Sequence, residues 1–286
     1  MWTVKELLDW TARDFAEKGV DTARLDAELL LAEAMQCSRL DLYLRFDDVP
    51  DENSLALFRE YVKRRRRREP VAYILGKKPF HDIEVHINPG VFISRPETEF
   101  LVDAAADRLK GIPAGKSKIL DIGCGSGAVI LSILNAVPLV QACAVDLDPK
   151  AGENLMQNAK RLGLKNRVRF FCGDLFEPVR DEGPFDMVTM NPPYIPTDEI
   201  PSLEPEVRDY EPYRALNGGP DGLDVIRRLL NESPPYIKYG GWLLFEIGEG
   251  QADRVKELAP PELSSEEFRK DLQGIPRVAV FRRVRE

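Results

Sequence analysis

Residues 186–196, DMVTMNPPYIP, end an apolar run in an amide, two prolines and an aromatic ring. Pro192 excludes the helical region for Asn191 and fixes the path of the chain. The side-chain oxygen of Asn191 and the carbonyl of Pro192 can then each accept one hydrogen of an incoming NH₂ group. Tyr194, which follows Pro193, offers a flat face for a planar amide or base. The simpler alternative is that these prolines only end a strand, because they lack a backbone donor.

Two acceptors aimed at one NH₂ group suit the methylation of a planar nitrogen. Such a nitrogen is a poor nucleophile because its lone pair is delocalised into a carbonyl or a ring. The acceptors draw electron density onto the nitrogen and aim its lone pair at a sulfonium methyl, so the gain is positioning and electrostatics. No histidine base is needed, because the proton can leave after the positive charge has formed. The only histidines, His81 and His86, lie in the other half of the chain.

A glycine-rich segment, ILDIGCGSGAV, lies earlier in the chain, between a predicted strand and its helix. Gly123, Gly125 and Gly127 let the backbone approach a ligand and expose amides at a helix N-terminus. The spacing is shorter than in the dinucleotide fingerprint, which disfavours a pyrophosphate ligand. Glycine-rich turns of this kind bind several cofactors, so the pattern alone does not identify the ligand.

Two carboxylates follow the next two predicted strands. Asp146 ends the segment ACAVD and can accept both hydroxyls of a ribose. Its alternative role, a helix cap, is filled better by Asp148. Asp174 ends the third predicted strand, at the usual height of an adenine ring, with Leu175 as an apolar neighbour. All these groups follow the carboxyl ends of strands, where open sheets bind ligands.

The elements that position these residues alternate between strand and helix from residue 96 onward. This alternation predicts an open α/β sheet with helices on both faces and a final strand in RVAVFRR. Residues 1–75 instead predict a helical domain, with Thr3 and Glu6 spaced as a capping box. Residues 76–95 predict a β-hairpin connector, which leaves 96–286 as the catalytic domain.

Two features of the first hundred residues have competing interpretations. The run Arg64–Arg68 falls at a predicted helix C-terminus, where cations favour the macrodipole; the alternative is an acidic or phosphate-bearing partner. His81 and His86 lie five apart in a strand-like stretch and so on opposite faces, which disfavours a metal site. We therefore expect no metal.

Composition narrows the class of protein. The 286 residues are 43% hydrophobic, and the formal net charge of −8 argues mildly against a bulk nucleic-acid binder. Four cysteines form no Cys-x-x-Cys pair, and the N-terminus carries charges with no apolar signal core. No apolar run is long enough to span a membrane. We expect a cytoplasmic protein.

Taken together, the motifs resemble those of class I S-adenosylmethionine-dependent methyltransferases that act on amino groups. More narrowly, the chain resembles the bacterial peptide chain release factor glutamine N5-methyltransferases. The resemblance runs nearly end to end and adds further segments to the glycine loop and the Asn-Pro-Pro-Tyr motif: RRRRREPVAYILGKKPF, FISRPETEFLV, EPYRALNGGPDGL, FEIGEGQ and GIPRVAVFRR.

The resemblance implies a Rossmann-like, mostly parallel sheet with an antiparallel last strand. It implies S-adenosyl-L-methionine as cofactor, S-adenosyl-L-homocysteine as product, and class I release factors as partners. The implied substrate is the glutamine of a Gly-Gly-Gln loop, with a role in translation termination. The implied cofactor contacts are Gly123, Cys124, Gly125, Ser126, Gly127, Asp146, Leu175 and Asn191. The implied contacts with the target glutamine are Asn191, Pro192, Pro193 and Tyr194.

Further candidates carry open alternatives. Arg95 and Glu97 either cover the methionine end of the cofactor or simply begin a helix. Glu246 ends an apolar strand and either holds the site's hydrogen bonds or caps a structural element. Asp121 precedes the glycine loop. Glu211 and Arg214 could pair only with one another.

Two rival functions remain open from the sequence alone. The first is an adenine-N6 methyltransferase that acts on DNA or RNA. Such an enzyme must also methylate a poorly nucleophilic nitrogen, because its target is an exocyclic amine on a ring. It would have to extrude the base and should carry a basic target-reading module, which the acidic charge disfavours. A non-catalytic cofactor-binding protein is the second rival, and an intact Asn-Pro-Pro-Tyr motif beside an intact glycine loop disfavours it.

Overall fold

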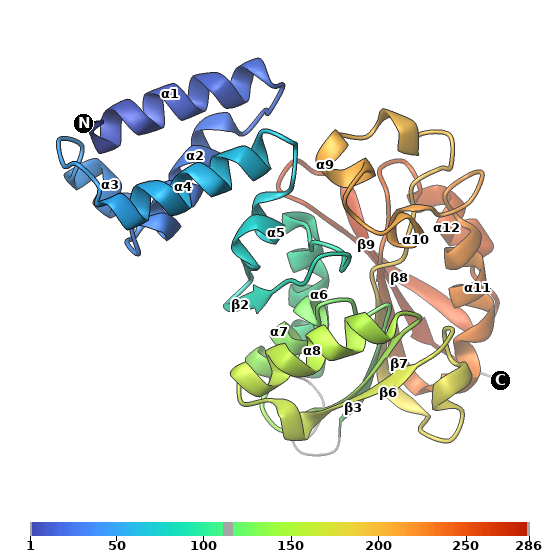
Figure 1. The fold of residues 1–286 in the computed structure, drawn as a ribbon. Helices are drawn as coiled ribbons and strands as arrows, with labels where there is room; N and C mark the ends of the chain where they lie inside the picture. Colours follow the sequence, from blue (N-terminus) through green and yellow to red (C-terminus); the bar gives the residue numbers. More distant parts are fainter. Residues whose placement is uncertain (1, 111–116, 285–286) are drawn as a thin grey trace. The chain divides into compact units, whose positions relative to one another are not determined.

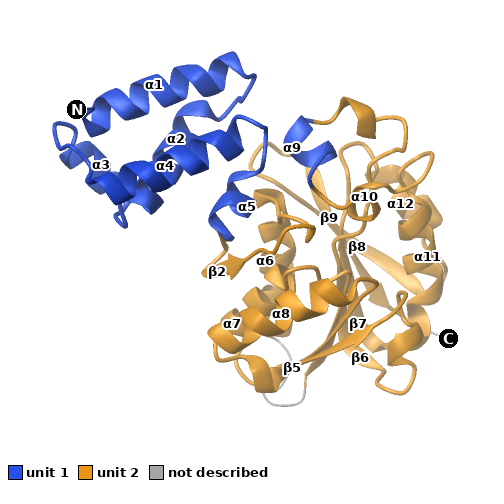
Figure 2. Ribbon diagram, viewed as in Figure 1, with its two compact units in different colours: residues 1–77, 204–210 blue, residues 78–203, 211–286 orange. Residues whose placement is uncertain are grey.

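The computed structural model describes residues 2–110 and 117–284 of the chain. These residues form two compact units, shown in Figures 1 and 2. Unit 1 comprises residues 1–77 and 204–210, and unit 2 comprises 78–203 and 211–286. Unit 1 is therefore discontinuous in sequence. No helix among the described residues is both long and apolar enough to cross a membrane.

Unit 1 is helical, as the sequence predicts. The hydroxyl of Thr3 accepts from the backbone of Glu6, whose side chain accepts from the backbone of Thr3, so the predicted capping box is confirmed. The apolar faces of the helices share one core that includes Leu8, Leu30 and Phe58. The helices are α1 (Val4–Glu17), α2 (Ala23–Ala34), α3 (Arg39–Leu44), α4 (Glu52–Arg65), α5 (Val71–Leu75) and α9 (Pro205–Arg208).

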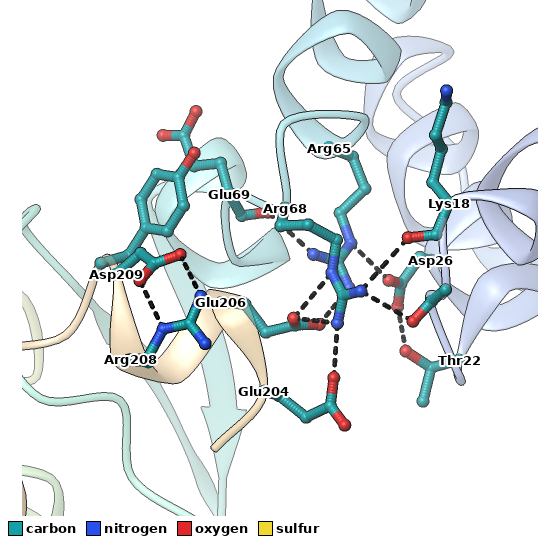
Figure 3. Close-up of polar contacts among 12 residues, drawn as sticks. Lys18, Thr22, Asp26, Arg65, Arg68, Glu69, Glu204, Glu206, Arg208 and Asp209 are labelled. Carbon is teal, nitrogen blue, oxygen red and sulfur yellow. Dashed lines mark hydrogen bonds and ion pairs between the residues drawn. The ribbon is translucent and has the colours of Figure 1, made fainter. Parts of the chain in front are cut away.

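Helix α9 is held within unit 1 by an ion-pair network at the end of α4 (Figure 3). The guanidinium of Arg65 donates to Asp26 on α2 and to Glu206 on α9, each at 2.7 Å. Arg68 pairs with the same Glu206 and, at 2.6 Å, with Glu204. The Arg65 side chain is only 3% exposed, so these charges interact with little screening. We call these five residues the Arg65–Arg68 network.

The rest of the arginine run is also engaged inside unit 1. Arg64 pairs with Glu69 at 2.5 Å, and Arg66 pairs with Asp14 at 3.2 Å. The helix does end at this run, at Arg65, as predicted. The alternative interpretation, an acidic or phosphate-bearing partner for the run, stays a prediction, which the structure makes less favourable for the four residues Arg64, Arg65, Arg66 and Arg68. Their charges already have carboxylate partners in the chain.

Unit 2 contains a seven-stranded sheet in the order β5-β4-β3-β6-β7-β9-β8. Strands β3 to β7 pair in parallel, whereas β9 pairs antiparallel with β7 and with β8. This confirms the predicted mostly parallel sheet with an antiparallel last strand. The strands are β3 (Lys118–Ile122), β4 (Gln141–Asp146), β5 (Val168–Cys172), β6 (Phe185–Met190), β7 (Ile237–Glu246), β8 (Leu263–Lys270) and β9 (Pro276–Arg283).

Helices cover both faces of this sheet (Figure 1). Successive residues of β3 point to opposite faces, so Ile119 packs with α6, α7 and α8, whereas Leu120 packs with α11 and α12. The helices of unit 2 are α6 (Glu99–Leu109), α7 (Ala128–Ala136), α8 (Pro149–Arg161), α10 (Tyr213–Leu216), α11 (Asp224–Glu232) and α12 (Ala252–Leu258). Short 3₁₀ helices are η1 (Pro96–Thr98), η2 (Lys165–Arg167), η3 (Glu177–Val179), η4 (Ile200–Ser202) and η5 (Pro234–Tyr236).

Strands β1 (Lys77–Phe80) and β2 (Ile83–His86) pair with each other, which confirms the predicted hairpin. The side-chain amides of Asn154 and Asn158 on α8 bond to the backbone of His86 and so fix the end of β2. Asn158 also donates to the carbonyl of Ser126, at 2.9 Å. The hairpin end is thus tied directly to the glycine loop.

The order of the strands creates a crevice beside β3. After β3 the chain continues to β4 and β5 on one side, and it then returns to the other side of β3 with β6. Loops from β3 and β6 therefore diverge at the carboxyl end of the sheet. Open α/β sheets bind ligands at such a switch point, and both predicted motifs lie there.

Candidate active site

The glycine loop connects β3 to α7 with three left-handed residues. The φ angles are +66° at Gly123, +53° at Gly125 and +84° at Gly127, a region that other residues rarely adopt. A Cβ added to Gly127 would lie 2.3 Å from the side chain of Leu155, so this position also lacks the space for one. The left-handed backbone and the close side chain of Leu155 on α8 both favour glycine at the start of α7.

Asp146 is oriented by the same loop. One carboxylate oxygen accepts from the backbone of Gly125 and the other from that of Asp148, each at 2.9 Å. Burial raises the pKa of this carboxyl group, and the two backbone donors oppose that effect. Asp148 caps α8, as predicted. The amide of Cys124 donates to the carbonyl of Val145, which ties the loop to β4.

Asp121 lies in the floor of the crevice. Its carboxyl group is buried and accepts from the hydroxyl of Thr189 on the neighbouring β6, at 2.8 Å. Burial raises the pKa of Asp121 to about 7, because the charged form loses its hydration.

Two predicted cofactor contacts have other partners in this structure. Asp174 pairs with Arg228, with 2.9 Å between the closest atoms. The side chain of Leu175 is buried in the apolar core and its φ is +43°, an unusual value for leucine. Contacts of these two residues with an adenine ring stay predictions.

The Asn-Pro-Pro-Tyr motif follows β6 directly and faces the glycine loop. A Cβ added to Gly123 would lie 3.9 Å from the backbone oxygen of Asn191, so the two motifs are neighbours. The side-chain amide of Asn191 donates to the hydroxyl of Thr98, at 3.2 Å. The hydroxyl of Tyr194 donates to Glu246 at the end of β7, at 2.9 Å.

Residues 216–222 and Gln251 support this loop from behind. A Cβ added to Gly218 would lie 2.8 Å from the carbonyl of Pro193, and one on Gly222 would lie 2.3 Å from that of Tyr194. Gln251 donates from one side-chain amide to the carbonyls of Tyr194 and Gly222. Gly218 and Gly222 of NGGPDG are therefore required by close packing against the motif's backbone.

Glu246 is almost completely buried, with 1% of its surface exposed. Burial raises its pKa, while the hydroxyls of Thr98 and Tyr194 lower it. Its Oε2 atom has no hydrogen-bond partner among the described residues. The bond from Tyr194 agrees with the interpretation in which Glu246 holds the site's hydrogen bonds, and that role stays a prediction.

Arg95 is held by Glu211, which corrects one expectation. The guanidinium of Arg95 donates to Glu211 at 2.5 Å, and the second oxygen of Glu211 accepts from the backbone of Ile93. Glu211 therefore pairs with Arg95 and not with Arg214. Glu97 acts on Glu246 only through its charge, which raises the pKa of Glu246.

Comparison with known proteins agrees with this arrangement. Residues 6–76 match the family model described as the PrmC N-terminal domain, and residues 82–201 match that of the methyltransferase small domain. The ribosomal protein L11 methylase of Lactobacillus delbrueckii subsp. bulgaricus has a similar structure. The TM-score is 0.51 and the identity 15%, over 70% of this chain and 86% of that one. The fold and the crevice thus define an enzyme of the methyltransferase class.

Two curated relatives narrow this class. The release factor glutamine methyltransferase of Geobacter sulfurreducens is 43% identical over 255 residues, which cover 89% of this chain and 87% of the relative. That of Rhodopirellula baltica is 41% identical over 281 residues, or 97% and 95% of the two chains. The chain belongs to the release factor glutamine methyltransferase family.

Proposed function

We propose that this enzyme transfers a methyl group from S-adenosyl-L-methionine to the side-chain nitrogen (N5) of the glutamine in the Gly-Gly-Gln motif of class I peptide chain release factors. It would thereby modulate translation termination. The observation that carries the proposal is the adjacency of the two motifs, in which Gly123 of the glycine loop directly faces Asn191. The curated relatives' names support the substrate class.

The crevice fits this cofactor by its chemistry. Each oxygen of Asp146 accepts one backbone hydrogen and keeps a free lone pair, so the carboxylate can still accept ribose hydroxyls. The loop Gly123–Gly127 carries only the two small side chains of Cys124 and Ser126. When bound, S-adenosyl-L-methionine supplies an electrophilic methyl group and leaves as S-adenosyl-L-homocysteine.

The Asn-Pro-Pro-Tyr loop orients the substrate nitrogen. The Oδ1 atom of Asn191 and the carbonyl of Pro192 each accept one N–H of the glutamine amide, while the ring of Tyr194 packs against the amide plane. The nitrogen held in this way would accept the methyl group that the bound cofactor supplies and would then release one proton to water. The chain contributes position and electrostatics, so no general base is required.

Transfer of tritium from labelled cofactor to purified release factor, DNA and RNA tests this function. We expect label on the release factor alone, and mass spectrometry should place it on the glutamine of the Gly-Gly-Gln motif. Label on nucleic acid instead would support the adenine-N6 alternative and overturn the proposal.

The variant Asn191→Ala tests the role of the motif. We expect kcat to fall by about a hundredfold, as when a preorganised polar contact to a reacting group is removed. The affinity for the cofactor, measured by calorimetry, should stay within a few-fold of the wild type. A kcat near that of the wild type would mean that Asn191 only ends a strand.

A further inference from the structure

Two buried asparagine amides on α8 hold the end of the hairpin connector. The side chains of Asn154 and Asn158 belong to residues that are 0% and 1% exposed. The carbonyl of His86 accepts from both of them, each at 2.8 Å. In return, the backbone N–H of His86 donates to Asn158 and that of Asn88 donates to Asn154, each at 3.0 Å. The two side chains therefore make the same kind of contact with the connector.

Asn158 makes one further contact, which reaches the glycine loop. The Nδ2 group of an asparagine carries two hydrogens, and Asn158 donates the second of them to the carbonyl of Ser126, at 2.9 Å. The reversed amide would place its oxygen against two carbonyls and its NH₂ group against the N–H of His86. The orientation of this side chain is therefore fixed, and its oxygen and both hydrogens bond to backbone groups.

The carbonyl that Asn158 holds belongs to a peptide unit that is bonded at both ends. The N–H of the same unit, on Gly127, donates to the carbonyl of Cys124 at 2.8 Å. Gly127 has a φ of +84° and no Cβ, so its own backbone restricts the rotation of this unit less than another residue would. Helix α7 begins at the next residue, Ala128. The orientation of this peptide unit therefore directs the backbone amides that the loop and the start of α7 offer to a ligand.

We infer that Asn158 is a positioning residue for cofactor binding, which fixes the peptide unit between Ser126 and Gly127 and joins it to the end of the connector. The inference rests on the proposed function, because it takes the glycine loop as the cofactor site. Asn158 acts through the loop, since its own oxygen and hydrogens are engaged with backbone groups.

The connector meets the same loop at a second point. A Cβ added to Gly125 would lie 4.0 Å from the side chain of Val91, which is itself buried. Residues 86–91 therefore contact the loop through Val91 and, by way of Asn158, through Ser126. Because coupling between two sites is reciprocal, a cofactor that binds to the loop should in turn stabilise the bond between Ser126 and Asn158.

The first test compares Asn158→Ala with Asn154→Ala in the full-length enzyme. Each change removes a buried amide from α8 and frees part of the connector, so both should lower the thermal midpoint. Only Asn158→Ala also frees the carbonyl of Ser126. Below both midpoints, we expect Asn158→Ala to weaken the binding of S-adenosyl-L-homocysteine, measured by calorimetry, by about tenfold and Asn154→Ala by less than about twofold. Equal affinities in the two variants would overturn the inference.

The kinetics of the same variants separate positioning from chemistry. With release factor as substrate, Asn158→Ala should raise the KM for the cofactor by about tenfold, whereas kcat at saturating cofactor should stay within about twofold of the wild type. A lower kcat with an unchanged KM for the cofactor would contradict a role in positioning it.

A third measurement uses the wild type alone and so does not require either variant to fold. The side-chain hydrogens of Asn154 and Asn158 can be assigned by through-bond NMR correlations. Saturation with S-adenosyl-L-homocysteine should slow the exchange of the Asn158 hydrogens with water severalfold more than that of the Asn154 hydrogens. Global stabilisation by the ligand slows both alike and cancels in this comparison. Equal slowing of the two side chains would overturn the inference.

These outcomes distinguish the inference from the proposed function. If the wild type binds the cofactor but does not methylate release factor, the proposed substrate is wrong, while calorimetry and exchange still decide on Asn158. If the wild type methylates release factor and the two variants bind the cofactor equally, only the inference is wrong. If the wild type binds neither S-adenosyl-L-methionine nor S-adenosyl-L-homocysteine, both are wrong.

Discussion

At the scale of single residues, the carboxylate of Asp146 accepts a hydrogen bond from the glycine loop and also faces the crevice. We expect Asp146→Ala to weaken cofactor binding by about one to two orders of magnitude, because each lost charge-assisted hydrogen bond contributes about 1.5–3 kcal/mol. Calorimetry measures the affinity. Glu153→Ala, an exposed change on α8, is the matched control and should leave the affinity unchanged. An unchanged affinity in Asp146→Ala would remove this residue from the cofactor site.

The raised pKa of Asp121 predicts how stability depends on pH. In the unfolded chain this carboxyl group loses its proton near pH 3.9, but in the folded protein only near pH 7. Between these values the folded state binds the extra proton, so Asp121 contributes a free energy of unfolding that falls as pH rises from about 4 to about 7. We expect urea unfolding of Asp121→Asn, compared with the wild type from pH 5 to pH 8, to lack this loss. A constant difference between the two proteins across that range would contradict it.

The sequence predicts those site residues whose orientation is set by their neighbours in the chain. Asn191 and Asp146 can be predicted from the sequence. The proline after Asn191 and the strand end at Asp146 restrict where these side chains can point. Thr98 and Gln251 stand inside segments that are conspicuous in the sequence, RPETE and FEIGEGQ, yet neither was a candidate. Their roles depend on which atoms lie behind the Asn-Pro-Pro-Tyr loop, and that is a tertiary fact. Likewise, the residues around Glu211 in the sequence do not indicate that it forms an ion pair with Arg95 and not with Arg214.

At the scale of elements, the Arg65–Arg68 network fastens α9 to α2 and α4. We expect Arg65→Ala to lower the free energy of unfolding by about 3–5 kcal/mol, because it leaves the buried Asp26 without its cationic partner, whereas Glu206 keeps Arg68. Urea unfolding followed by circular dichroism measures this loss. Arg67→Ala, an exposed neighbour, is the control and should stay within about 0.5 kcal/mol of the wild type. Similar losses of unfolding free energy in the two variants would mean that the buried ion pairs of Arg65 add nothing to stability beyond an exposed arginine.

The elements that the sequence failed to predict share a physical reason. Strand β8, LSSEEFRK, is polar over most of its length because it forms an edge of the sheet, so its apolar pattern is weak. Its neighbour β9 is buried on both faces and was predicted without difficulty. Helices α3 and α5 have six and five residues, too few to show a periodic pattern.

At the scale of the whole molecule, recognition must extend beyond the Asn-Pro-Pro-Tyr loop. A glutamine amide is small and common, so this loop cannot select one glutamine among many, and remote contacts must also help to position it. We therefore expect whole release factor to be methylated with a much higher kcat/KM than a short peptide containing Gly-Gly-Gln. Equal values for the two substrates would contradict the prediction.

We propose that residues 1–75 supply part of this recognition, and a deletion of these residues tests that role. Removing them leaves Glu204 and Glu206 without their arginines, so both should be changed to glutamine in the shortened chain. The shortened enzyme should still bind cofactor and methylate the peptide, but lose most of its preference for the whole protein. If it folds and keeps the same ratio, recognition resides in residues 76–286.

The discontinuity of unit 1 has a consequence for how the protein is made. Arg65 and Glu206 are separated by 141 residues, and a ribosome adding about 5–20 residues per second needs roughly 10–30 s to cover that distance. During this time the amino-terminal helices are already outside the ribosome, but the buried guanidinium of Arg65 has only Asp26 as its carboxylate partner. The last native contacts of the first-made unit therefore form only after strands β3 to β6 have been synthesised. The unit whose residues are synthesised first is therefore among the last to complete its native contacts.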